Sequence, residues 1–178
     1  MRTKTIVALL VLAVLVSACV AQPDPYKMNV GGQKMTTRAN LEEAAKVPVY
    51  PDASTLKSVL LTPDVGVIKI AYIPANESNG FYTVAGFEIS YKMTIIQKAV
   101  FGDYPNIEGL VLNSTDEAYK LASVRSPVIL MRAGAERTAV TVDGNVVIVE
   151  GKDMTEEGRA YTDLDLAADK LLLSLLEV

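Results

Sequence analysis

A serine and a lysine in this chain have the spacing that base-assisted nucleophilic chemistry needs. In the run Ser54-Thr55-Leu56-Lys57, the lysine follows the serine by three residues. A neighbouring amine can accept the proton of a serine hydroxyl and so make its oxygen a better nucleophile. One hypothesis is therefore a serine hydrolase or acyltransferase that works through Ser54 and Lys57.

The same four residues match the S-x-x-K motif and resemble the nucleophile element of penicillin-binding proteins and serine β-lactamases. The resemblance implies that Ser54 is the nucleophile and that Lys57 helps to activate it. Those enzymes also use an S-D-N-type element and a K-T-G-type strand, and neither occurs in this sequence. The resemblance is therefore confined to this short motif.

Acidic residues near the C-terminus could bind a hard cation. Asp163, Asp165 and Asp169 follow Glu156 and Glu157 in the sequence. Calcium needs many oxygen ligands, and an EF-hand loop also needs a glycine that is missing at the matching place. Acids at this position also stabilise the N-terminus of a helix through its dipole. We expect the helix role and no metal site.

The residue types that the chain lacks exclude several classes of site. There is no histidine and no tryptophan, and Cys19 is the one cysteine. The lack of histidine excludes Ser-His-Asp and Cys-His catalytic sites, HExxH zinc sites and every metal site with a histidine ligand. We expect no enzyme activity and no cofactor.

Two asparagines lie in N-x-[S/T] sequons, Asn76-Glu77-Ser78 and Asn113-Ser114-Thr115. In an exported protein, Asn76 or Asn113 could carry a glycan on a surface loop. Both residues also suit an unmodified turn or helix cap. The sequence leaves these two interpretations open.

The first residues have the three parts of a signal peptide. Arg2 and Lys4 give a positive start, residues 6–16 are an uninterrupted apolar run, and small residues follow. A membrane-spanning helix needs about 20 apolar residues, and this run is shorter. We expect residues 1–18 to direct export and then to be removed.

The residues Val16-Ser17-Ala18-Cys19 resemble the lipobox of bacterial and archaeal lipoproteins. The resemblance ends at Cys19 and implies cleavage between Ala18 and Cys19 with a thioether-linked lipid on Cys19. As the sole cysteine, Cys19 has no partner for an internal disulfide. The alternative is an ordinary secretory signal that contains a cysteine.

The charge of the chain limits its partners. The precursor has a formal net charge of −4, and loss of Arg2 and Lys4 with the signal makes the mature chain more acidic. An acidic surface repels phosphate backbones and anionic headgroups. We expect no nucleic-acid partner, and we expect the lipid on Cys19 to make the membrane attachment.

Behind the signal we expect a lipid-bearing tether over residues 19–37 and one globular domain over residues 38–178. The run from Val20 to Thr37 contains two prolines, a Gly-Gly pair and no sustained apolar period, which is typical of a linker. A short helix capped by Asn40 follows it. The remaining length is enough for one hydrophobic core.

Apolar periods predict alternating strands and helices in this domain. Two β-rich runs at residues 55–61 and 67–73 flank a turn and predict a hairpin. Apolar residues at three- and four-residue steps predict a helix over residues 84–102. Strands at 108–113 and 127–132 enclose a helix that a capping box begins at Ser114.

The C-terminal third predicts a second hairpin and a last helix. Residues 138–142 and 146–150 flank Asp143-Gly144-Asn145, a strong hairpin signal. After a cap at Thr162, apolar residues line one stripe of a helix. The expected fold is a single small α/β (or α+β) domain, with a mixed sheet of parallel βαβ units and β-hairpins packed by about three helices.

Parallel strands would bring polar loop residues together at one sheet edge. If the strands at 67–73, 108–113 and 127–132 are parallel, their carboxyl ends share the edge where open α/β sheets bind ligands. That edge would present five polar side chains that suit a small neutral or anionic ligand: Asn76, Asn79, Asn113, Ser114 and Arg132.

Three functions remain open at this point. The first is a membrane-anchored envelope lipoprotein on the extracytoplasmic side of the cell membrane, acting as a non-enzymatic binding or assembly module with an envelope protein as partner. The second is a small-ligand-binding or sensory module that uses the sheet edge. The third is the hydrolase that would depend on Ser54 and Lys57.

Overall fold

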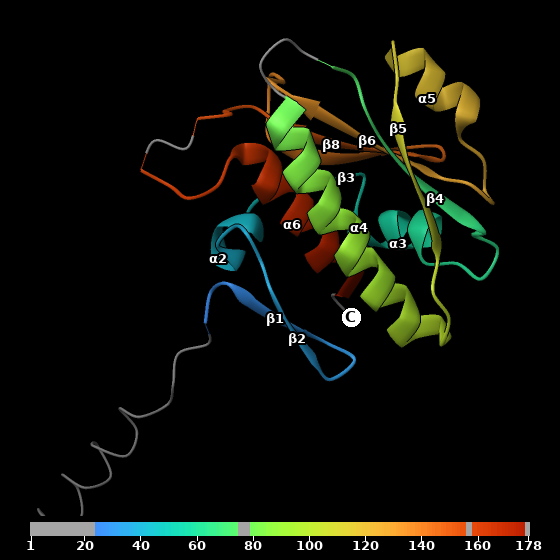
Figure 1. Ribbon diagram of the computed structural model, residues 1–178, viewed down its shortest axis with the longest axis horizontal. Helices are drawn as coiled ribbons and strands as arrows, with labels where there is room; N and C mark the ends of the chain where they lie inside the picture. Colours follow the sequence, from blue (N-terminus) through green and yellow to red (C-terminus); the bar gives the residue numbers. More distant parts are fainter. Residues whose placement is uncertain (1–23, 75–78, 156–157, 177–178) are drawn as a thin grey trace, which may run out of the picture.

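The computed structural model describes residues 24–74, 79–155 and 158–176. A six-stranded mixed sheet of order β3-β7-β8-β6-β4-β5 forms the centre (Figure 1). All neighbouring strands in it are parallel except β7 and β8. Its strands are β3 (Val49–Tyr50), β4 (Val67–Tyr72), β5 (Asn106–Val111), β6 (Val128–Ala133), β7 (Ala139–Asp143) and β8 (Val146–Gly151).

Helices cover the two faces of this sheet unequally. Helices α4 and α6 pack against each other on one face, whereas α5 packs on the other (Figure 1). Five helices are described where about three were expected: α2 (Leu41–Ala44), α3 (Ala53–Leu60), α4 (Asn79–Phe101), α5 (Thr115–Leu121) and α6 (Asp163–Leu176). The predicted α/β class is confirmed.

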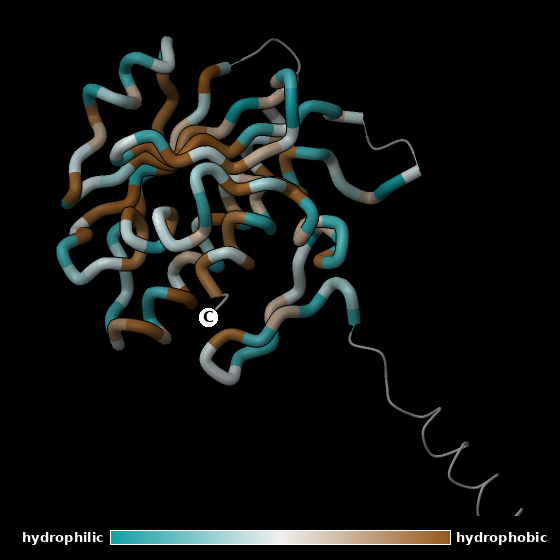
Figure 2. The backbone as a smooth tube through the Cα atoms, turned by 180° about the vertical axis from the view of Figure 1, so that it is seen from behind, coloured by the Kyte–Doolittle hydropathy of each residue, from teal (hydrophilic) through white to brown (hydrophobic). Residues whose placement is uncertain are grey.

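The central strands supply much of the apolar core, and Figure 2 shows hydrophobic residues gathered along them. Along β6, Ile129 and Met131 join the larger core under α4 and α6, while Val128 and Leu130 join the smaller core under α5. This alternation follows from the two-residue period of a strand. It fixes which polar residues of the strands face α5.

The predicted βαβ arrangement is confirmed. From β4 the chain passes through α4 to β5 and through α5 to β6, and both β5 and β6 pair with β4 in parallel. The strands expected at 67–73, 108–113 and 127–132 therefore share one edge at their carboxyl ends. The helix α4 ends just before Gly102, whose φ of 79° favours glycine.

The hairpin around Asp143-Gly144-Asn145 is also confirmed. Asp143 pairs with Val146, so Gly144 and Asn145 form the two-residue turn between β7 and β8. Gly144 has a φ of 58°, which a glycine adopts without steric cost. A local turn signal was enough to predict this element.

The strand expected at residues 55–61 is wrong, and so is the hairpin built on it. Residues 55–60 lie in helix α3, where Leu56 and Leu60 are buried on the same side, and Leu61 is its C-cap residue. The side chain of Asp52 accepts a hydrogen bond from the Thr55 backbone N–H at 2.8 Å. This N-cap and the four-residue apolar spacing outweigh the β preference of the threonine and valine.

The tether expected over residues 19–37 is folded from Lys27 onward. Strands β1 (Lys27–Val30) and β2 (Gln33–Thr36) form an antiparallel hairpin with Met28, Val30 and Met35 in the core. The Gly-Gly pair is its turn, with φ of 55° at Gly31 and 84° at Gly32. A Cβ at Gly31 would lie 2.8 Å from the Ala99 Cβ, so the hairpin packs tightly on α4.

Helix α6 approaches the sheet closely at the end of β8. A Cβ on Gly151 would lie only 2.4 Å from the backbone nitrogen of Leu164. Leu164, Leu171 and Leu175 are buried as the apolar stripe predicts. Among the described residues, no helix has both the length and the apolar character to cross a membrane.

Candidate functional site

The polar residues predicted for the sheet edge do not all have a described side chain. Asn76 lies outside the described residues, and for Asn79 only its place as the first residue of α4 is described. Asn113 follows β5 and Ser114 is the N-cap residue of α5. Both are exposed, so Asn113 is accessible at the surface as a sequon asparagine must be.

The capping box expected at Ser114 forms differently. The Ser114 side chain makes no capping hydrogen bond, while Glu117 accepts one from the Asn113 backbone N–H at 2.7 Å. The Asn113 side-chain amide also donates to Glu117 at 3.3 Å. These hydrogen bonds lower the pKa of Glu117 below its usual value. Asn113 is therefore occupied by a local partner.

Arg132 lies on a different part of the sheet. It faces the α5 side of β6 and stands in register with Glu150 of β8. Its Nη1 donates to Glu150 Oε1 at 3.1 Å. Arg132 is on β6 and Asn113 follows β5, and β4 lies between these two strands. The two side chains have different partners, Glu150 for Arg132 and Glu117 for Asn113.

Arg132 belongs instead to a row of side chains that we name the arginine strip: Tyr50, Arg137, Glu150 and Arg132. Arg137 Nε donates to Glu150 Oε2 at 3.5 Å, and its guanidinium carbon lies 4.9 Å from the Tyr50 ring centroid. Arg137 Nη2 also donates to Thr141 Oγ1 at 3.2 Å. Charge pairing, hydrogen bonds and a cation–π contact thus fix Arg137.

The strip exposes its arginines and buries its carboxylate. The side chains of Arg132 and Arg137 are 45% and 53% exposed, whereas that of Glu150 is 11% exposed. Each guanidinium has five N–H donors, so donors remain after the bonds to Glu150. Two fixed guanidinium groups at a surface suit a carboxylate or phosphate group.

A hydroxyl–carboxylate pair lies near this strip. The Tyr119 hydroxyl donates to Asp143 Oδ2 at 2.7 Å. This hydrogen bond raises the pKa of Tyr119, and the positive charge of Arg132 acts in the opposite direction. The strip contains no nucleophile–base pair, because its one carboxylate already accepts from both arginines. Its arrangement fits recognition of an anion.

Of this strip, only Arg132 is among the residues predicted from the sequence. Glu150 carries a usable signal, because it ends the apolar run Val146-Val147-Ile148-Val149 of a strand buried on both faces. A carboxylate in such a strand needs a charged partner. The identity of that partner was not visible, since Tyr50 and Arg137 come from other segments.

Ser54 and Lys57 lie in α3, one turn apart. The Ser54 hydroxyl donates to Asp52 Oδ1 at 2.7 Å, and the same oxygen accepts from the Thr55 backbone N–H. The hydroxyl proton is thus directed at a helix cap. The hydrolase hypothesis gains no support from this geometry.

The C-terminal acids do not form a cluster. Asp163 accepts from Thr138 at 2.7 Å, Asp165 accepts from Thr162, and Asp169 pairs with Lys92 at 3.1 Å. Glu156 and Glu157 lie outside the described residues. No three metal-binding side chains gather anywhere in the described ranges. The acids act in structural hydrogen bonds and ion pairs.

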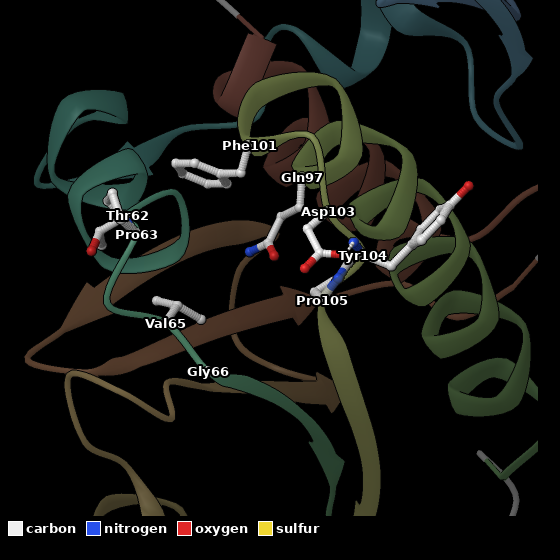
Figure 3. A pocket seen from close by; sticks show the side chains of 9 residues that line it. All are labelled: Thr62, Pro63, Val65, Gly66, Gln97, Phe101, Asp103, Tyr104 and Pro105. Atoms are coloured by element: carbon white, nitrogen blue, oxygen red, sulfur yellow. Dashed lines mark hydrogen bonds between the residues drawn. The ribbon is translucent and has the colours of Figure 1, made fainter.

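A cavity of about 390 Å³ opens at the amino ends of β4 and β5 (Figure 3). Gln97 points into it from α4, and its amide donates to the Leu60 carbonyl at 3.0 Å. Asp103 lines the cavity and accepts from the Tyr104 backbone N–H. Ligands of open α/β sheets bind at the opposite, carboxyl edge. The arginine strip is the stronger candidate.

Comparison with known proteins gives no family for this chain. No protein-family model matches it, and searches of curated proteins and of solved structures found no significant match.

Proposed function

We propose that this protein is a lipoprotein anchored through Cys19 on the extracytoplasmic side of the cell membrane, where it acts as a non-enzymatic binding module. In this proposal the arginine strip binds an acidic segment of an envelope protein. The observation that carries the proposal is the pair of exposed guanidinium groups that Glu150 holds side by side.

The physical support comes from preorganisation and charge. Arg132 and Arg137 are already fixed in the free protein, so their side chains lose little further conformational entropy when a partner's carboxylates bind. Arginine and tyrosine are also the residue types that most often dominate binding energy at protein interfaces. The positive strip on an acidic chain favours an acidic partner surface over a basic one.

Crosslinking and capture from host envelopes with the lipidated protein tests this proposal. We expect the Arg132→Gln/Arg137→Gln variant to lose captured partner by about tenfold or more, since two charge-assisted contacts disappear. The control is Arg125→Gln, which removes one exposed arginine outside the strip. Capture should also fall as salt rises.

Two results would contradict the proposal that the arginine strip binds an acidic segment of an envelope protein. Equal capture by wild type and the strip variant would remove the strip from the interface. Stabilisation of the protein by free dicarboxylates or inorganic phosphate, lost in the strip variant, would instead identify a small-ligand site.

A further inference from the structure

Helix α4 exposes three apolar side chains on one face. Val84, Phe87 and Tyr91 follow each other at steps of three and four residues and are 37%, 67% and 55% exposed. The Phe87 and Tyr91 rings are stacked with centroids 6.1 Å apart and an angle of 2° between their planes. We name these three residues the aromatic face.

A groove of about 520 Å³ runs beside this face. Val84 and Phe87 line it from α4, and residues 36–38 line it from the end of β2 and the segment that follows. The backbone N–H of Thr37 donates to the Tyr26 carbonyl at 2.7 Å. The wall of the groove opposite α4 is therefore hydrogen-bonded to the first described residues of the chain, and Tyr26 itself is 38% exposed.

The hairpin makes the connection from Cys19 to this region short. In a chain cleaved before Cys19, five residues, Cys19 to Pro23, would precede Asp24. Fully extended, such a segment spans at most about 18 Å. A lipid on Cys19 would therefore keep the start of the folded domain within that distance of the membrane surface.

Buried charges fix α4 relative to the anchored end. Lys92 of α4 pairs with Asp169 of α6 at 3.1 Å, with both side chains 1% exposed. Asp169 also accepts from the Ala39 backbone N–H at 2.8 Å, just after the segment that lines the groove. The aromatic face and the chain end that leads to Cys19 therefore belong to one rigid unit.

We propose that the aromatic face of α4 docks on the bilayer that holds the lipid of Cys19. The inference rests on the proposed lipid anchor. Phenylalanine and tyrosine suit the headgroup region, where an apolar ring meets lipid and a hydroxyl meets water. The bilayer is the occupant because only the groove separates the face from residues 36–38, and Thr37 is hydrogen-bonded to the end of the domain that the lipid would restrain.

Docking also orients the rest of the molecule. The aromatic face lies on the side of the sheet that carries α4, and the arginine strip lies on the side that carries α5. With α4 against the membrane, the strip points away from it. An envelope partner could then reach Arg132 and Arg137.

A single tryptophan reports on the docking directly, because the chain contains none. Phe87→Trp keeps an aromatic ring at an exposed position in the full-length, lipidated protein. In phosphatidylcholine vesicles with brominated acyl chains we expect its emission to shift to the blue and to lose half or more of its intensity. Val124→Trp is the control, since Val124 is 59% exposed on the connection between α5 and β6.

Flotation of the same vesicles separates this inference from the anchor. If the protein floats and Phe87→Trp is not quenched, or both tryptophans are quenched equally, the docking is wrong and the anchor stands. If Phe87→Trp is shifted to the blue but not quenched, a second copy of the chain covers the face and the docking is again wrong. If the lipidated protein does not float, the anchor is wrong and the docking fails with it.

Discussion

At the residue scale, one buried ion pair connects three parts of the fold. Lys92 and Asp169 are both 1% exposed at the side chain, and Glu88 is a second partner of the lysine. Burial raises the pKa of Asp169, while the charge of Lys92 and the hydrogen bond from Ala39 act against this. The pair joins α4, α6 and the segment after β2 at one point.

We expect Asp169→Ala to lower the free energy of unfolding by about 3–5 kcal/mol, because it removes a buried partner of the Lys92 ammonium and the acceptor of the Ala39 backbone N–H, with Glu88 left as the lysine's remaining partner. Urea denaturation measures this. Asp64→Ala, at an exposed turn, is the control and should change little. A loss below about 1 kcal/mol would show that water or Glu88 replaces the missing carboxylate.

Asp163 makes a pH-dependent contribution to the free energy of unfolding. Burial alone would raise its pKa, but hydrogen bonds from Thr138, the Asp153 backbone N–H and Arg159 together hold it below the usual 3.8. A lowered folded-state pKa contributes stability above pH 3.8 that is lost as the pH falls through the folded value. We expect Asp163→Asn to cost about 1–2 kcal/mol at pH 7.

The measurement for Asp163 is denaturant unfolding from pH 7 down to pH 2. The difference between wild type and Asp163→Asn should shrink below pH 3.8. Asp116→Asn, an exposed acid in the first turn of α5, is the matched control. A difference that stays constant or grows on acidification would contradict the assignment.

At the scale of elements, β8 and α6 approach each other closely at Gly151. A Cβ on Gly151 would lie 2.4 Å from the Leu164 nitrogen and 2.7 Å from its Cα, and these backbone atoms cannot move aside cheaply. We expect Gly151→Ala to cost about 1–3 kcal/mol through displacement of α6. Thermal unfolding followed by circular dichroism checks this.

Gly109→Ala is the control for that substitution, because a Cβ at Gly109 meets nothing within 4 Å. We expect Gly109→Ala to unfold near the wild-type temperature. Equal effects of the two substitutions would mean that the close approach at Gly151 does not matter for stability.

Elements with strong local signals were predictable. The turn at Gly144 and the three-to-four-residue apolar steps of α4 fix those elements without distant contacts. The β1–β2 hairpin was missed because its strands are short and its apolar residues are covered only by α4 and the core. Helix α3 was missed because its threonine and valine favour a strand, whereas the Asp52 cap that stabilises the helix lies before the predicted run.

The candidate site was predictable only in part. Arg132 was expected at a sheet edge with Asn113, yet its partner is Glu150 of β8, the neighbouring strand on the side away from β5. Tyr50, Arg137 and Glu150 come from three separate segments that parallel and antiparallel pairing brings together. Such long-range contacts leave no local pattern in one sequence.

At the scale of the whole molecule, the two proposals assign the two sides of the sheet to different tasks. The side with α4 and the β1–β2 hairpin would face the membrane, and the side with α5 and the arginine strip would face a partner. The folded hairpin matters for this arrangement, because a flexible tether up to residue 37 would let the domain turn freely. A short connection restrains it.

The lipid on Cys19 is the claim on which this arrangement depends. Mass spectrometry of the protein purified from host membranes tests it most directly, through the intact mass and the N-terminal peptide. We predict a chain that begins at Cys19 and carries a thioether-linked lipid on that residue. A mature chain with unmodified Cys19, or one cleaved at another position, would contradict the account.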